Sequence, residues 1–235
     1  MAARNSACRR GFTLIEVLVA IGVLGILMTA VMLAFDQTQR NVQYTQEHAE
    51  LMQNVRAATE QFHRELSQAI INNNRPDGEQ VYFEIKQLAP EQSVLRFGCT
   101  TERGLVEIGY QVRPSDEGWN NYELWRLYRT RDMWNYNEPD WPALDLSSGD
   151  AAGGDLEPFA FGIVGFKVRY WSSQYGRWVA GNWESIDRNA MPRKIQIVLK
   201  AITAMDAKRQ PKVTKIEDLQ GIEKFTIEIN LPQAR

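Results

Sequence analysis

A single ionisable side chain, Glu16, lies inside a long apolar segment that runs from residue 12 to residue 35. If this segment crosses a membrane, an ionised carboxylate costs roughly 2 to 3 kcal/mol near the centre and less toward an interface. A cation can offset that cost, and cleavage after Gly11 would supply one by giving Phe12 a free α-amino group. We therefore expect Glu16 to pair with the Phe12 amine of a neighbouring subunit. The alternative is a carboxylate that reaches the polar boundary of the membrane.

The element that must position Glu16 is the apolar segment itself, whose only other polar side chains are Thr13 and Thr29. As a helix rising ~1.5 Å per residue, it is long enough to span a hydrocarbon core of ~30 Å. A buried core helix is one alternative, but few globular helices are apolar on every face over this length. A secretory signal peptide is another, but its apolar region would cover only ~7 to 15 residues. We predict a transmembrane helix over residues 12–35.

The basic residues around the segment predict its orientation. Arg9 and Arg10 precede it, and the next basic residue, Arg40, follows it. Basic residues favour the cytoplasmic side of a membrane. We therefore expect a single-pass protein with a cytoplasmic N-terminus and the bulk of the chain on the far side.

The residues from Arg10 to Val17, RGFTLIEV, resemble the prepilin cleavage and methylation motif, with its glycine before the cut, its phenylalanine after it and its glutamate. The resemblance implies that residues 1–11 are a leader, which prepilin peptidase removes between Gly11 and Phe12. It also implies that Phe12 is N-methylated and that Glu16 steers assembly into a filament.

Residues 36–71 are predicted to continue the helix as an amphipathic half. Apolar or small residues recur every three or four positions, at Val42, Ala49, Met52, Val55, Thr59, Phe62, Leu66 and Ala69. Such a stripe packs on the protein's own sheet more often than on a partner, although a partner-binding face is the alternative. The helix is expected to stop at residues 72–78, NNNRPDG, because these residue types break helices and build turns.

After residue 78 the apolar pattern changes to a period of two, which is typical of strands with one buried face. The alternation covers four segments, Val106 to Val112, Phe166 to Tyr170, Ile195 to Leu199 and Phe225 to Leu231. Residues 134–158 are expected to form a long loop. The chain is therefore predicted to have an α+β fold, with the long helix packed on a mostly antiparallel β-sheet domain over residues 72–235.

Composition excludes some classes of function. With 235 residues, the chain is long enough for one main globular unit. Its formal net charge of −2, without a local basic stripe, argues against a nucleic-acid partner.

The sequence contains no recognisable arrangement for catalysis, a cofactor or structural zinc. Cys8 lies in the proposed leader, which leaves Cys99 as the one thiol of the mature chain, with no CxxC pair. His48 and His63 lie near opposite ends of the amphipathic half, so we expect surface or packing roles. No phosphate-binding glycine loop, HExxH or G-x-S-x-G motif occurs. No catalytic, metal or cofactor residue is predicted.

Two groups of residues leave a binding function open. All seven tryptophans lie between residues 119 and 183. They could form a platform for a glycan, although packing of the sheet or a protein interface is the more common use of such side chains. Asp145, Asp150 and Asp155 could supply oxygen ligands for calcium, but their spacing does not match an EF-hand loop, and acidic, glycine-rich loops are usually solvated.

A second resemblance extends over nearly the whole chain. Its motifs are Gly165 to Trp171 (GFKVRYW), Arg177-Trp178, Trp183, Met191-Pro192-Arg193 before Ile195-Gln196-Ile197, and Leu231-Pro232. In order and spacing they are similar to the J-type minor pseudopilins of type II secretion. Met191 stands where that family more usually has a leucine, and residues 208–218 look like a longer loop than the family typically carries.

This resemblance implies a structural role at the tip of the pseudopilus, without an enzymatic activity or a cofactor. The expected partners are the I-type and K-type pseudopilins, the major pseudopilin, prepilin peptidase and the inner membrane. The expected task is to prime assembly and to help export folded proteins through the outer membrane, with the β-rich domain in the periplasm. A minor pilin of a type IV pilus is the closest alternative, and a membrane-anchored enzyme or glycan-binding module is a more distant one.

Overall fold

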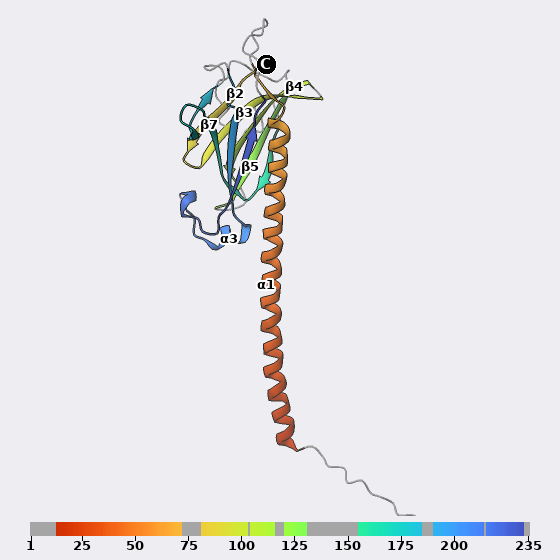
Figure 1. The fold of residues 1–235 in the computed structure, drawn as a ribbon. Helices are drawn as coiled ribbons and strands as arrows, with labels where there is room; N and C mark the ends of the chain where they lie inside the picture. The colour runs from red at the N-terminus through yellow and green to blue at the C-terminus, as the bar shows by residue number, and fades with distance from the viewer. Residues whose placement is uncertain are drawn as a thin grey trace, which may run out of the picture. The chain divides into compact units, whose positions relative to one another are not determined.

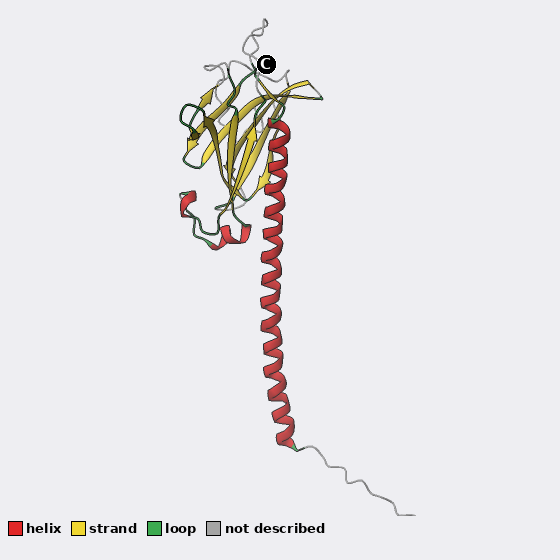
Figure 2. Ribbon diagram, viewed as in Figure 1, coloured by secondary structure: helices red, strands yellow, loops and turns green. Residues whose placement is uncertain are grey.

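The computed structural model describes residues 13–71, 81–102, 104–115, 120–130, 155–184, 190–213 and 215–232. The chain divides into two compact units, residues 1–46 and residues 47–235. The described part of the first unit is helical, and strands make up most of the described part of the second (Figures 1 and 2). The predicted α+β fold is confirmed.

One helix, α1, extends from Leu14 to Leu66 (red to orange in Figure 1). Its end was predicted wrongly, because the prediction continued the helix to Ile71. Instead, Ala69–Ile70 form the short strand β1, which pairs with Cys99 and Gly98. The carbonyl of Gln68 also accepts a hydrogen bond from the backbone N–H of Thr100. The chain thus leaves the helix because these backbone groups bond to a strand that is distant in the sequence.

The remaining strands form one sheet with β1. They are β2 (Phe83–Ala89), β3 (Gln92–Thr101), β4 (Gly104–Pro114), β5 (Tyr122–Thr130), β6 (Asp155–Phe161), β7 (Ile163–Ser172), β8 (Arg177–Ala180), β9 (Trp183–Glu184), β10 (Lys194–Ala201) and β11 (Glu223–Asn230). The main order is β11-β10-β7-β3-β4-β5-β6, with β8 beside β7 and β9 beside β2.

All pairings among the described strands are antiparallel except the parallel contact between β3 and β7, at Gln92 and Phe166. The four segments with period-two alternation lie in β4, β7, β10 and β11, as predicted, except that Leu231 follows the last residue of β11. The predicted loop over residues 134–158 is wrong at its C-terminal end, because β6 begins at Asp155. The rest of that loop lies outside the described residues.

The second half of α1 packs on the sheet through a stripe that differs in part from the predicted one. The buried apolar positions are Leu51, Val55, Ala58, Phe62 and Leu66. The predicted members Val42, Ala49 and Met52 are exposed. The prediction failed there because two neighbouring stripes on this helix both carry apolar residues, and only the sheet decides which one is buried.

Aromatic side chains form the centre of the core between α1 and the sheet. The ring of Phe62 packs edge-on against Tyr110 of β4 at 4.7 Å and is stacked on Phe166 of β7 at 5.9 Å, measured between centroids. Cys99 is buried in the same cluster. Burial raises the pKa of its thiol to about 12, so Cys99 packs as an apolar residue.

A second apolar cluster lies under the segment between β10 and β11. It contains Val164, Ile202, Ala207 and Leu219. The segment includes the short helix α3 (Ala204–Arg209) and the 3₁₀ turn η3 (Ile216–Asp218). Thr203 caps α3 by accepting a hydrogen bond from the N–H of Asp206. Part of the predicted long loop over residues 208–218 is therefore structured.

Candidate functional site

The site predicted from the sequence begins at the N-terminal end of α1. Gly11 and Phe12 lie outside the described residues, so the position of the cleavage site stays a prediction. Glu16 is in the first turn of α1, where its N–H donates to the carbonyl of Thr13 at 3.1 Å. A carboxylate in the first turn of a helix interacts favourably with the helix dipole. Its side chain is exposed in the isolated chain.

The helix around Glu16 presents apolar side chains to every side. From Leu14 to Phe35 every side chain is exposed, and α1 is long and apolar enough to cross a membrane by length and composition. The hydroxyl of Thr29 donates to the carbonyl of Gly25 at 2.8 Å, so this polar group is satisfied inside the helix. An apolar surface of this extent requires lipid or other apolar helices to cover it.

A buried carboxylate joins the other end of α1 to the sheet. Glu65 accepts hydrogen bonds from Nε and Nη2 of Arg126 on β5, at 3.0 and 2.5 Å, and from the hydroxyl of Tyr110 on β4. Burial and the charge of Glu65 raise the pKa of Tyr110 well above its ordinary value. The sequence patterns did not predict this network, although an acidic residue beside the buried positions Phe62 and Leu66 of the helix was a usable signal.

A second ionic network is buried on the opposite face of the sheet. Arg96 donates to Glu107 at 3.1 and 2.7 Å, and the hydroxyl of Tyr82 donates to the same carboxylate at 3.0 Å. A guanidinium nitrogen of Arg129 lies 3.7 Å from the other oxygen of Glu107. Burial, with the nearby Glu107 carboxylate, raises the pKa of the Tyr82 hydroxyl. Period-two alternation predicts a solvated face for these residues, so their burial could not be read from the pattern.

The two histidines have the separate positions that the sequence predicted. His48 is half-buried, and its Nδ1 lies 3.2 Å from a carboxylate oxygen of Glu223 at the start of β11. The adjacent Glu47 accepts a hydrogen bond from the backbone N–H of Met205 at 2.8 Å. His63 is exposed. These contacts connect α1 to the chain segment around α3 and β11, and no metal-ligand cluster occurs in the described part of the chain.

The tryptophans that the structure describes pack against other side chains. Trp171 and Trp178 form an edge-on pair across β7 and β8 at 5.4 Å, and Trp183 packs edge-on against Tyr170 at 4.8 Å. Trp125 lies beneath the guanidinium of Arg113. All four are half-buried. The other three tryptophans, Asp145 and Asp150 lie outside the described residues, as does the side chain of Asp155, so the calcium prediction is untested.

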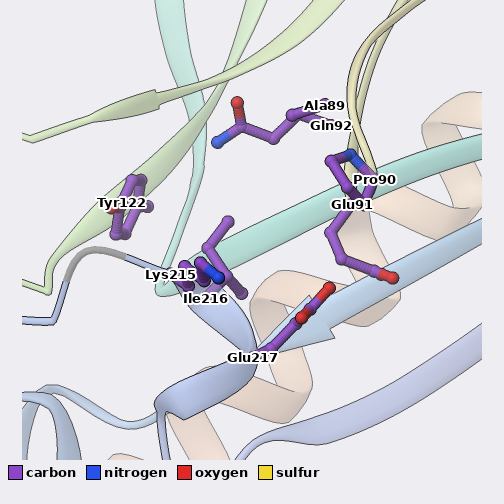
Figure 3. Close-up of a pocket in the computed structure, with 8 residues that line it drawn as sticks. All are labelled: Ala89, Pro90, Glu91, Gln92, Tyr122, Lys215, Ile216 and Glu217. Atoms are coloured by element: carbon purple, nitrogen blue, oxygen red, sulfur yellow. The ribbon is translucent and has the colours of Figure 1, made fainter.

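A cavity of about 320 Å³ lies between the turn that joins β2 to β3 and the η3 turn (Figure 3). Its lining is Ala89, Pro90, Glu91, Gln92, Tyr122, Lys215, Ile216 and Glu217. Glu91 is neutralised by Lys167 at 3.4 Å and Lys200 at 3.3 Å. The lining contains no histidine, cysteine or serine, so a thiol nucleophile or a serine–histidine pair cannot be built from it. The sequence predicted no site here.

Comparison with known proteins adds two findings. The family described as the prokaryotic N-terminal methylation motif matches residues 6–32. The chain is also 25% identical over 203 residues to the type II secretion system protein J of Vibrio cholerae serotype O1, which covers 81% of this chain and 80% of the relative. No solved structure gives a significant match.

These findings agree with the geometry. The methylation motif covers Glu16 and the start of α1, and the similarity to the relative extends over 81% of the chain, well beyond that motif. Similarity to a component of a secretion system favours a structural role over an enzymatic one. The apolar half of α1 fits anchoring in the inner membrane. The N-terminal motif, the α+β fold and the similarity along most of the chain's length together support a J-type minor pseudopilin of type II secretion.

Proposed function

We propose that the chain is cut between Gly11 and Phe12, and that the Glu16 carboxylate then pairs with the Phe12 amine of a neighbouring pseudopilin. The observation that carries the proposal is Glu16 itself, the one acidic residue within an exposed apolar helix surface. When such helices pack side by side, the carboxylate loses water and requires a cation. The N-methylated amine of Phe12 is such a cation, and it is created by the cleavage.

The order of the segments supports the proposed topology. The leader over residues 1–11 stays in the cytoplasm, residues 12–35 cross the inner membrane, and residues 36–71 carry the chain to the domain over residues 72–235 in the periplasm. The position of Arg9 and Arg10 before the apolar segment supports this direction. The chain assembles with the I-type and K-type pseudopilins at the tip of the pseudopilus, where it helps to prime assembly and export.

The experiment replaces Glu16 by valine in cells that depend on this gene for type II secretion. Glu16→Val makes the helix more apolar, so membrane anchoring and leader removal should be unchanged. Secretion of the exported proteins should fall to the level of a strain without the gene, because the amine of the neighbour loses its counter-ion. Glu60→Val is the matched control, since Glu60 is an exposed glutamate outside the apolar segment. Normal secretion by the Glu16→Val strain would overturn the role given to Glu16.

A further inference from the structure

The two outer strands of the sheet differ in a way that points to a partner. In β6, Pro158 is opposite Trp125, and the register shift beside it leaves Phe159 as a bulged residue. Proline and bulges are the usual means by which edge strands avoid pairing with another chain. In β11, eight consecutive residues pair with β10 without a shift or a proline. Of these two outer strands of the main order, as far as the described residues show, β11 is the one regular enough to accept another strand.

The hydrogen bonds show which groups of β11 are open. The N–H of Leu231 donates to the carbonyl of Arg193 at 3.0 Å, and this pair continues the register of β10 and β11. Hydrogen-bonded and non-hydrogen-bonded pairs alternate in an antiparallel ladder. Glu223, Phe225, Ile227 and Ile229 therefore bond to β10, whereas Lys224, Thr226, Glu228 and Asn230 direct their N–H and C=O groups away from it. The side chains of these last four residues are also exposed.

The side chains along this open edge indicate which residue types a partner strand should carry opposite them. Lys224 is basic, Thr226 is β-branched and Glu228 is acidic, and Gln196 holds Glu228 in place at 3.1 Å. Opposite charges and β-branched pairs stabilise neighbouring strands, and like charges destabilise them. An antiparallel partner strand should therefore read basic-x-β-branched-x-acidic in its own direction.

A second copy of this chain does not meet these conditions when both copies are anchored in one membrane. Antiparallel pairing of two β11 strands would match the charges, but it would reverse the direction of α1 between the copies. Parallel pairing would keep that direction and would place Lys224 beside Lys224 and Glu228 beside Glu228. The β6 edge of a second copy runs antiparallel to β11 but is interrupted by Pro158.

We propose that β11 is a strand-addition site for a different pseudopilin, whose own edge strand pairs antiparallel to it across Lys224, Thr226 and Glu228. The partner thereby extends the sheet beyond β11. This inference rests on the proposed function and names the surface through which the soluble domains meet.

The test uses the full chain, purified in detergent, and its capture of the I-type, K-type and major pseudopilins of the same cell. Thr226→Pro removes the outward N–H without removing a bond to β10, whereas Thr226→Val keeps that N–H. We expect Thr226→Pro to weaken capture by about tenfold or more and Thr226→Val to leave it within about threefold. Lys224→Glu, which leaves the backbone unchanged, should also weaken capture.

The outcomes separate this inference from the proposed function. If Thr226→Pro and Lys224→Glu capture the pseudopilins as well as the unmodified chain does, the β11 edge is not the contact and only this inference fails. If the unmodified chain captures no pseudopilin, the proposed function itself fails. If Thr226→Pro instead abolishes a homodimer of the full chain, the edge binds a second copy and the inference is overturned. Thermal unfolding of each variant confirms that the domain is intact.

Discussion

Arg126 on β5 donates two hydrogen bonds to one carboxylate oxygen of Glu65 on α1, while Tyr110 on β4 donates to the other oxygen. This arrangement fixes the end of the helix to two strands at once. Glu65 is almost fully buried, so its charge depends on these donors rather than on water.

Loss of one donor should therefore destabilise the β-rich unit. Arg126→Ala leaves Glu65 buried without its cation, and we expect a loss of about 3 kcal/mol in the free energy of unfolding. Arg56→Ala is the control, because the side chains of Arg56 and Glu60 are 81% and 66% exposed, and such pairs contribute about 0.5 kcal/mol or less. Urea unfolding of the full chain in detergent measures both. Equal effects of the two variants would show that the Glu65 network does not hold the helix.

Alkaline pH should weaken the fold through Cys99. Burial raises the pKa of its thiol from an ordinary value of 9.0 to about 12. The stabilising contribution is therefore complete below pH 9 and is lost as the pH rises from 9 toward 12, because the unfolded chain releases the proton first. Cys99→Ala should unfold more easily at pH 7 because it leaves a cavity, but its stability should fall less steeply between pH 9 and 11. Urea unfolding measures the free energy of unfolding of the unmodified chain and of Cys99→Ala at each pH. If that free energy fell with pH equally steeply in both proteins, the expectation would be contradicted.

Gly162, between β6 and β7, should not tolerate a side chain. Its φ is +72°, and a Cβ atom there would lie 2.7 Å from the carbonyl oxygen of Ile202, which belongs to the backbone and cannot move aside. Gly176 has a φ of +59° but open space around it, so Gly176→Ala tests the cost of the backbone conformation alone, about 1 kcal/mol. Gly162→Ala should cost roughly 1 to 3 kcal/mol more. Thermal unfolding measures both variants. If Gly162→Ala and Gly176→Ala melted at the same temperature, the close contact with the carbonyl oxygen of Ile202 would have no cost.

Processing at the N-terminus should depend on Gly11. Mass spectrometry of the membrane-bound chain is expected to find Phe12 as the first residue, with one methyl group on its amine. Gly11→Glu should leave residues 1–11 attached, because a bulky charged side chain would occupy the position before the cut. Gly25→Ala is the control, since nothing lies within 4 Å of a Cβ atom at that position. An uncut N-terminus in the unmodified protein would contradict the proposed processing.

The sequence was informative where local patterns decide the structure. A long apolar run before an amphipathic one predicts α1, and alternation of period two predicts β4, β7, β10 and β11. The RGFTLIEV motif also predicts the family, which the comparisons support.

The sequence was less informative where distant parts of the chain meet. The end of α1 depends on the pairing of β1 with β3. These two strands are not neighbours in the chain, because β2 lies between them. The buried stripe depends on which side of the helix the sheet covers. The networks around Glu65 and Glu107 depend on strand register, which places Arg126 opposite Tyr110 and Arg129 opposite Glu107. None of these relations is set by neighbouring residues alone.

Membership of the pseudopilus tip is tested by the capture of partners by the full, processed chain. A tagged copy is expressed at its natural level, extracted in detergent and analysed for the pseudopilins and the type IV pilins of the same cell. We expect the I-type and K-type pseudopilins to be recovered with it, and this recovery to be lost in Glu16→Val. Recovery of type IV minor pilins instead, without the pseudopilins, would contradict this expectation.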